Sequence, residues 1–410
     1  MKLIQNNLKV IYWIISLAGL LLALMLMDFN QGMSPYWIAP YLSASANFDL
    51  NNPFIMNVNY DQIKQFSMLS TEQQFNYKFP SNTILINYDY LPIGFMYILL
   101  IAKKIFFFLG DLTAVQWLQY TTHIIIVYTT MQFFKKDYLK ILFYLLYGLN
   151  PIVLYFVNYP FYYFWQVIPA FVFLWYFLSN KKLGYWVFAL VGILAYMYFV
   201  RATVLFLVLF IFLLYGYRES WRSSILACIS FLMLIFIFPS HSQAPWHTMY
   251  VGIGAYKNPY NIQLADEEGY KFFYNQTGKK MNSTNINDPQ LIDEYYQILK
   301  KEYFRILSEN PKLAIKNALL NIFQSYSIGY KVGNERIAYA SAFLGLLMIV
   351  LLLYSKQYVL FLAIGLLSGS FTPYYPPIAA YMYGSYILLV VAFIHIIEYL
   401  LAYKHKFKKV

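Results

Sequence analysis

Charged residues are scarce in this chain of 410 residues, because Asp, Glu, Lys and Arg make up only 12% of it while 60% is hydrophobic. A soluble domain carries about 25% charged residues, so this composition excludes a soluble globular enzyme. The single cysteine, Cys228, excludes an internal disulfide. The sequence also contains no glycine-rich phosphate loop, no Cys/His metal cluster and no Gly-x-Ser-x-Gly motif.

Long apolar runs are what the chain has instead, and its mean hydropathy is +0.50. Runs near 20 residues match the length of a helix that crosses the hydrocarbon core of a bilayer. The sequence therefore predicts an all-α polytopic membrane protein with about ten transmembrane helices. The expected spans are residues 10–27, 113–134, 141–159, 161–179, 184–200, 202–217, 224–239, 337–354, 357–372 and 378–402.

The net charge of +12 is interpreted as a topology signal and not as a nucleic-acid-binding surface. If the amino terminus is cytoplasmic, every short loop rich in Lys and Arg falls on the cytoplasmic side, as the positive-inside bias requires. Both termini are then cytoplasmic, in a bacterial inner or plasma membrane, and two long loops are extracytoplasmic. The expected division is a core at 1–240 that includes the first outer loop at 28–112, a partly helical second outer loop at 241–336, and C-terminal transmembrane helices at 337–410.

Both long loops are expected to carry interfacial helices. Residues 91–109 are apolar but contain Lys103 and Lys104, and a pair of lysines is costly at bilayer depth. This segment is therefore predicted to lie at the outer interface, with an eleventh span as the alternative. Residues 288–327 are predicted to be helical with a break at Asn310–Pro311.

Two aspartates are candidate catalytic carboxylates. Asp28 ends the first apolar run, where a rigid helix would hold a general base at the membrane face; it could equally be a plain helix-end residue. Asp89 precedes the predicted interfacial helix. It is either a second carboxylate facing the same cavity or a helix cap.

Several residues are candidate substrate ligands. Arg201 interrupts two apolar runs, and a guanidinium binds phosphate in a bidentate manner, although a hairpin tip is the simpler interpretation. Lys103 and Lys104 could bind a lipid phosphate or merely anchor their helix. The segment after the seventh span mixes aromatic, His and Asn residues as binding loops do, and supplies four further candidates: His247, Tyr250, Tyr256 and Asn258.

The order of these features resembles the GT-C superfamily of membrane glycosyltransferases. The resemblance lies in DFNQGMSPYWIAPYLSASANF, in YDYLPIGFMYILLIAKK and in YGLNPIVLYFVNYPFYYFWQVIPAFVFLWYF, where Asn150–Pro151 is expected near a bend. It covers residues 1 to about 220 in pattern and looks most like the branch that uses polyprenol-phosphate mannose. The resemblance implies inverting transfer of a sugar from a polyprenyl-phosphate donor to a lipid or glycan acceptor.

The same resemblance implies that Asp28 deprotonates the acceptor while basic residues steady the phosphate that leaves. Many members of the superfamily carry a second acid beside the first, whereas Phe29 stands there in this chain. No cofactor is therefore indicated, although a divalent metal stays open. Two other functions also stay open: an O-antigen ligase or polymerase-like enzyme that depends on Arg201 and His247, and a transporter or flippase of lipid-linked sugars.

Overall fold

A computed structural model of the chain describes residues 2–26, 35–81, 84–88, 91–179, 181–237, 245–281 and 289–407. Asp28 and Asp89 lie outside these residues. In the described part the protein is all-α, apart from two short antiparallel strands, as the sequence predicts. The chain divides into two compact units, which are Met1–Ala202 with Ile211–Ser240 (unit 1) and Thr203–Phe210 with His241–Val410 (unit 2).

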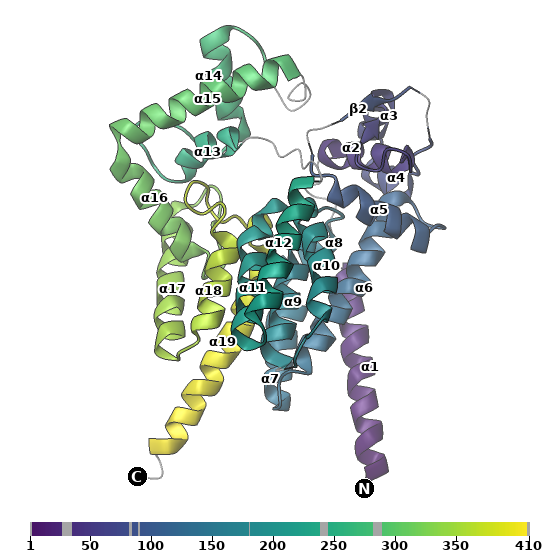
Figure 1. Cartoon of the computed structure of the whole chain (residues 1–410), viewed down its shortest axis with the longest axis vertical. Helices are drawn as coiled ribbons and strands as arrows, with labels where there is room; N and C mark the ends of the chain where they lie inside the picture. The colour runs from purple at the N-terminus through teal and green to yellow at the C-terminus, as the bar shows by residue number, and fades with distance from the viewer. Residues whose placement is uncertain are drawn as a thin grey trace. The chain divides into compact units, whose positions relative to one another are not determined.

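Unit 1 is a helical bundle joined to a small subdomain (Figure 1). The bundle contains α1 (Lys2–Leu26), α6 (Asp111–Met131), α7 (Asp137–Phe143), the π-helical turn η1 (Tyr144–Gly148), α8 (Pro151–Asn158), η2 (Phe164–Gln166), α9 (Val167–Ser179), α10 (Trp186–Val200) and α12 (Trp221–Ile237). The subdomain contains α2 (Pro35–Ala46), β1 (Asn57–Val58), α3 (Tyr60–Ser67), α4 (Thr71–Asn76), β2 (Ile86–Asn87) and α5 (Gly94–Ile105). The turn η3 (Ala202–Val204) and α11 (Leu205–Arg218) run through both units.

Local sequence signals explain where several helices begin. Asn59 caps α3, and Ser70 with Gln73 forms a reciprocal capping box at α4. Asn150 accepts hydrogen bonds from the backbone N–H groups of Ile152 and Val153 and is followed by Pro151 at the first turn of α8. The helix axis bends by 54° at this break, which is where the sequence predicted a bend.

The subdomain is attached to the bundle through a close contact between α5 and α10. A Cβ atom on Gly94 would lie 2.4 Å from the backbone carbon of Phe199 and from the backbone nitrogen of Val200. The Tyr196 hydroxyl donates to the Gly94 carbonyl oxygen at 3.0 Å. Glycine therefore lets the first turn of α5 rest directly on the last turn of α10, beside Arg201.

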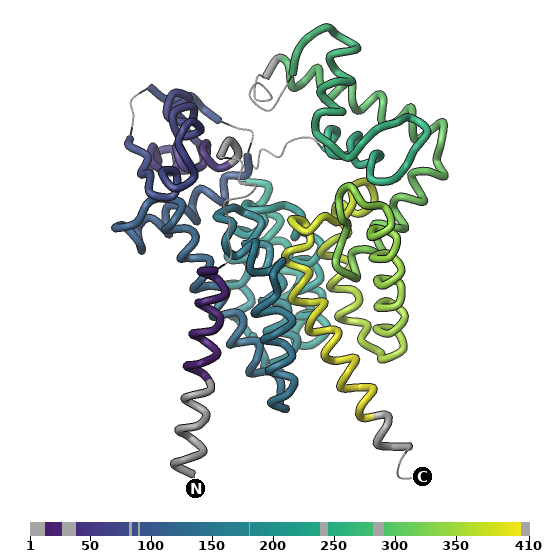
Figure 2. Tube along the Cα trace, turned by 180° about the vertical axis from the view of Figure 1, so that it is seen from behind, coloured from purple at the N-terminus to yellow at the C-terminus, as the bar shows by residue number. Residues whose placement is uncertain are grey.

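Unit 2 contains a group of three helices, the turn η4, the helix α16 and three apolar helices, of which two are long. Its elements are α13 (Trp246–Gly252), η4 (Ile253–Ala255), α14 (Asp266–Thr277), α15 (Pro289–Glu309), α16 (Pro311–Gln324), α17 (Glu335–Tyr354), α18 (Tyr358–Ser368) and α19 (Ala379–Phe407). The helices α13, α14 and α15 pack on one another, and α17, α18 and α19 pack side by side, as Figure 2 shows from behind. The break between α15 and α16 falls at Asn310–Pro311, as the sequence predicts, and Asn310 caps α16.

Helices long and apolar enough to cross a membrane are fewer than the sequence suggests. In the described residues two helices qualify, Glu335–Tyr354 and Ala379–Ala402, and the bent pair Asp137–Gly148 with Pro151–Asn158 would make a third. Six further apolar segments have 10–17 residues. One of them, Trp13–Leu26, is part of α1, which has 25 residues; at about 1.5 Å per residue the other five are shorter than the ~30 Å hydrocarbon core. The helices thus indicate a membrane protein. Two of these segments, Phe164–Ser179 and Ala202–Arg218, are short even though they include the turns η2 and η3 that precede α9 and α11.

The segment at 91–109 forms α5, which has 12 residues. At about 1.5 Å per residue its length is roughly 18 Å, so α5 by itself is too short to cross the ~30 Å hydrocarbon core. Lys103 and Lys104 lie in its last turn.

The contact at Gly94 predicts a large effect of a single methyl group. Gly94→Ala should destabilise the protein by about 1–3 kcal/mol, because the new Cβ meets backbone that cannot move aside. Gly192→Ala is the matched control: Gly192 lies in α10 with nothing within 4 Å of its Cβ position, so alanine should stabilise the helix by about 0.5–1 kcal/mol. Thermal unfolding of both variants in detergent measures the difference, and equal midpoints would contradict the close contact.

Candidate functional site

Arg201 is a buried cation held against aromatic rings. It lies at the end of α10, where its backbone N–H donates to the Met197 carbonyl at 2.9 Å, and only 6% of the residue is exposed. Its guanidinium carbon lies 4.9 Å from the centre of the Tyr163 ring and 5.2 Å from that of Tyr162. Both tyrosines are partly exposed. Such cation–π contacts orient the guanidinium plane and are stronger where water is excluded.

Tyr41 from α2 is the second polar group of this site. Its ring is fully buried and packs on Phe95 and Phe161 at centroid distances of 5.0 and 6.2 Å. Its hydroxyl has no hydrogen-bond partner among the residues that the structure describes. Burial raises the pKa of Tyr41 well above its ordinary value, nearby Tyr162 and Tyr88 raise it further, and Arg201 acts in the opposite direction. Tyr41 therefore remains a neutral hydroxyl, able to donate to an anion beside Arg201.

Tyr88, on one side of the undescribed positions 89 and 90, lies near Tyr41 of the same site. Tyr88 and Leu91, which flank the two residues outside the described part, are 2% and 8% exposed. The Tyr88 N–H donates to the Met56 carbonyl at 2.8 Å. Three residues after Leu91, Gly94 rests on the backbone of Val200, the residue before Arg201.

We call the group Arg201, Tyr162, Tyr163 and Tyr41 the Arg201 box.

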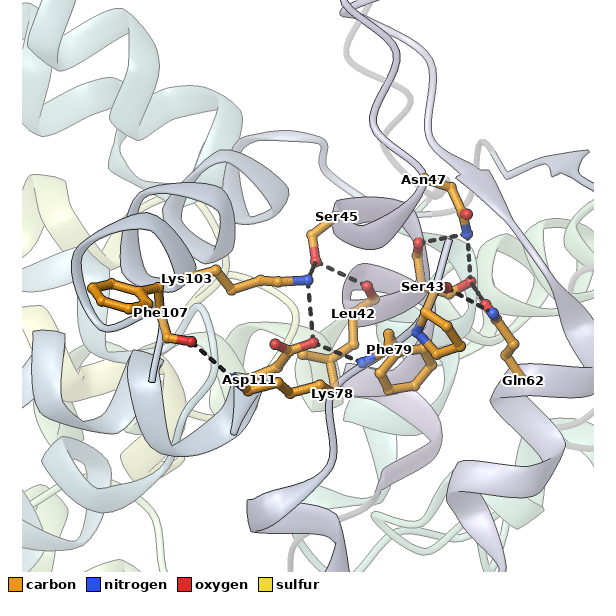
Figure 3. Close-up of polar contacts among 11 residues, drawn as sticks. Leu42, Ser43, Ser45, Asn47, Gln62, Lys78, Phe79, Lys103, Phe107 and Asp111 are labelled. Atoms are coloured by element: carbon orange, nitrogen blue, oxygen red, sulfur yellow. Dashed lines mark hydrogen bonds and ion pairs between the residues drawn. The ribbon is translucent and has the colours of Figure 1, made fainter. Parts of the chain in front are cut away.

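Lys103 has a structural partner that the sequence analysis did not foresee. Figure 3 shows its ammonium group directed at Asp111 of α6 and Ser45 of α2, at 3.1 Å from Asp111 Oδ2 and 3.3 Å from Ser45 Oγ. The Asp111 side chain is 5% exposed and also accepts from the Phe79 N–H at 3.1 Å. This ion pair joins α5, α6 and α2. Lys104 is exposed and remains the lysine of the pair that can reach a lipid phosphate.

A second network orders the subdomain beside this ion pair (Figure 3). Gln62 Nε2 donates to the Pro80 carbonyl at 2.7 Å, and Gln62 Oε1 accepts from Ser43 at 3.3 Å. Ser43 Oγ also accepts from the Asn59 N–H at 2.9 Å. These bonds satisfy buried polar groups, so they serve the fold rather than chemistry.

His247 belongs to unit 2 and joins three helices. Its Nε2 lies 3.1 Å from Asp266 Oδ1, and its Nδ1 is hydrogen-bonded to the hydroxyl of the fully buried Tyr295. Burial raises the pKa of Tyr295 above its ordinary value, so Tyr295 donates and Nδ1 accepts, which leaves the Nε2 proton for Asp266. A Cβ on Gly269 would lie 2.5 Å from the Tyr295 hydroxyl and 3.0 Å from His247 Nδ1. The arrangement therefore pins α13, α14 and α15 together.

The three other predicted ligands of unit 2 are largely buried. Tyr250 and Tyr256 are 4% and 1% exposed. Asn258 Nδ2 donates to the carbonyls of Tyr256 and Ile262, while its Oδ1 accepts from the N–H groups of Tyr260 and Ile262. The hydrogen bonds of Asn258 stabilise the conformation of the loop at 256–262. Because Tyr250 and Tyr256 are almost fully buried, only a small part of each could contact a substrate.

No cluster of three or more His, Cys, Asp or Glu side chains that could hold a metal occurs in the part of the chain that the structure describes. The chain matches no family model, no curated protein and no solved structure. Its function must therefore be argued from the sites themselves.

Sequence reasoning missed Tyr41, Tyr162 and Tyr163 of the Arg201 box, and the Asp111 partner of Lys103. The chain has 43 tyrosines, so no single tyrosine stands out by type. Asp111 follows Gly110 at the start of a predicted span, which is the signature of a first-turn acid. The position of Asp111 in a first helical turn indicates a role in the fold, but it does not indicate that Lys103 is its partner.

The Lys103–Asp111 ion pair should contribute measurably to stability. Asp111→Asn leaves Lys103, whose side chain is 23% exposed, without its counter-ion and should cost about 1–3 kcal/mol. Asp137→Asn is the control, because Asp137 pairs with Lys140 at the surface with its side chain 89% exposed, and such pairs contribute about 0–1 kcal/mol. Chemical unfolding followed by tryptophan fluorescence would reject the structural role if both variants behaved alike.

The His247–Asp266 bond predicts an acid-sensitive contact. The hydrogen bond from His247 holds the pKa of Asp266 below its usual range. This hydrogen bond therefore adds to the free energy of unfolding at any pH above the ordinary aspartate pKa of about 3.9. Its contribution is lost as the pH falls through the lower pKa that Asp266 has in the folded protein. Hydrogen exchange of α13 should accelerate over that acidic range in the native chain. In Asp266→Asn this transition should be absent; a transition of unchanged size would contradict the assignment.

Proposed function

We propose that the chain is an integral membrane glycosyltransferase that moves a sugar from a polyprenyl-phosphate donor to a lipid or glycan acceptor. In this proposal it has a GT-C-like arrangement of about ten spans, both termini are cytoplasmic, and transfer takes place with inversion on the extracytoplasmic face.

The Arg201 box is the single observation that carries the proposal. The Arg201 guanidinium lies over the rings of Tyr162 and Tyr163, and a guanidinium carries five N–H donors in one plane. The adjacent Tyr41 hydroxyl is buried and has no partner within the described residues. A positive charge and a spare donor in a water-poor site suit a phosphate on which negative charge grows as the sugar departs.

The carboxylates complete the proposed reaction. Asp28 takes the proton from the acceptor hydroxyl as the new glycosidic bond forms and the bond between sugar and lipid phosphate breaks. Asp89 follows the buried Tyr88, whose proximity contributes to the raised pKa of Tyr41. Because Tyr88 lies near Tyr41 and Asp89 is the next residue in the chain, Asp89 is the better candidate for a second carboxylate of the site. His247 has both ring nitrogens engaged by Tyr295 and Asp266, which favours transfer based on a carboxylate over a ligase-like role for this histidine.

Asp28→Asn tests the proposal most directly. The amide keeps the size of the side chain but cannot take a proton, so sugar transfer should slow at least about a hundredfold. The assay follows release of polyprenyl phosphate from a panel of polyprenyl-phosphate hexoses and pentoses in reconstituted vesicles. Arg201→Lys should lose about tenfold or more in the same assay, because an ammonium cannot make bidentate contacts to phosphate.

Asp89→Asn discriminates between the two acids. The alternative that Asp89 caps the following helix is wrong, because α5 begins at Gly94 with Ile93 at the N-cap position. If Asp89 has only a structural role, this variant loses stability and keeps its turnover. An inactive Asp89→Asn with an active Asp28→Asn would make Asp89 the base. Full activity of both variants would refute the glycosyltransferase proposal.

A further inference from the structure

A preformed groove in unit 2 lies apart from the residues used above for sugar transfer. Its volume is about 440 Å³, and it is lined by the loop 254–264 and the turn 330–335. Tyr256 and Tyr330 form its floor, with ring centroids 5.8 Å apart. The Tyr330 hydroxyl donates to the Ala255 carbonyl, and the Lys257 N–H donates to Glu335 Oε1 at 2.6 Å. Asn258 also stabilises the loop through its hydrogen bonds to Tyr256, Tyr260 and Ile262, so the groove is formed in the absence of a ligand.

The groove lies at one end of a candidate membrane span. Glu335, which lines it, is the first residue of α17. Large apolar side chains of α17 are exposed from its first turn onward: Ile337 by 41%, Phe343 by 60% and Leu344 by 52%. Exposed apolar side chains on a helix of this hydropathy face lipid tails. The groove would thus open at the depth of the lipid headgroups, where the exposed Tyr339 also matches the aromatic belt of membrane proteins.

Cations gather around this opening. Lys257 lines the groove, and Lys331 and Arg336 flank the lining residues in sequence; all three are exposed. Lys316 lies 5.7 Å from the ring centre of Tyr256 and 5.9 Å from that of Tyr339. Among the lining residues Glu335 is the single acid, and it already accepts from the Lys257 backbone. Around the turn 330–335 and Lys257, three exposed cations therefore stand against one acid, while Asp266, Glu267 and Glu268 follow the other end of the lining loop in sequence.

The usual charge bias of membrane proteins does not explain these cations. In the proposed topology this end of α17 is extracytoplasmic, the side on which Lys and Arg are normally fewer. Lys and Arg close to a membrane surface attract anionic lipid headgroups, by about 1 kcal/mol for each side chain.

We propose that the groove between loop 254–264 and turn 330–335 binds the phosphate headgroup of an anionic phospholipid, with Lys257, Lys331 and Arg336 as its cationic ligands. The acyl chains then lie along the exposed apolar face of α17. The proposal depends on α17 spanning the membrane and not on the sugar-transfer activity. Such a lipid would anchor unit 2 at the interface.

Native mass spectrometry of the full chain with added phosphatidylglycerol or phosphatidylcholine tests the proposal. The native chain should bind phosphatidylglycerol in preference to phosphatidylcholine. The triple variant Lys257→Gln, Lys331→Gln, Arg336→Gln should lose about tenfold or more of its affinity for phosphatidylglycerol. The control triple variant Lys64→Gln, Lys271→Gln, Lys301→Gln removes the same charge from exposed positions on α3, α14 and α15 and should bind as the native chain does.

Three results would overturn the proposal. They are unchanged phosphatidylglycerol binding in the groove variant, an equal loss in the control variant, and displacement of the lipid by millimolar inorganic phosphate, which would make the groove a site for free phosphate. Because the measurement involves no sugar transfer, a negative result leaves the assay on Asp28 and Arg201 unaffected. A chain inactive in that assay could still show the lipid preference.

Discussion

The contact between α5 and the last turn of α10 is the constraint on which unit 1 depends. Because residue 94 is glycine, the backbone of α5 lies directly on Phe199 and Val200. That contact determines the positions of the other side chains of α5. Phe95 packs on Tyr41, and Lys103 forms an ion pair with Asp111. Arg201 follows Val200 immediately, so the position of the guanidinium is a consequence of the same contact. A bulkier residue would separate the two helices and with them the components of the Arg201 box.

Charged side chains are few in this protein, and several of the charged and polar side chains bind more than one partner each. Asp111 holds Lys103 and the Phe79 N–H, Asn258 closes its loop with four bonds, and Glu219 accepts from the N–H groups of Leu183 and Gly184 and from the Tyr176 hydroxyl. An unsatisfied polar group inside an apolar protein costs a large share of its marginal stability. Such side chains therefore act as structural joints. The Tyr41 hydroxyl is one of several buried polar atoms without a partner among the described residues, and its proximity to Arg201 makes it the candidate ligand.

The two units offer different chemistry. Unit 1 holds a buried guanidinium among aromatic rings, an environment suited to a phosphate whose charge changes during a reaction. Unit 2 holds exposed cations around an open groove at the end of a candidate span, an environment suited to steady binding. His247, which as a residue type suggests catalysis, is instead committed to Tyr295 and Asp266. A histidine in a sequence of binding-loop composition can thus be a structural joint.

The sequence alone determined the features that depend on neighbouring residues. The all-α class follows from the apolar runs, and the breaks at Asn150–Pro151 and Asn310–Pro311 follow from a capping side chain placed before a proline. It did not determine where each apolar helix begins, because turns such as η2 and η3 are as apolar as the helices they precede. Only the tertiary structure brought Arg201 to Tyr162 and Lys103 to Asp111 and engaged both nitrogens of His247. The reason is physical: helix caps act over three or four residues, whereas ion pairs and ring contacts join whichever side chains the packing of distant helices places together.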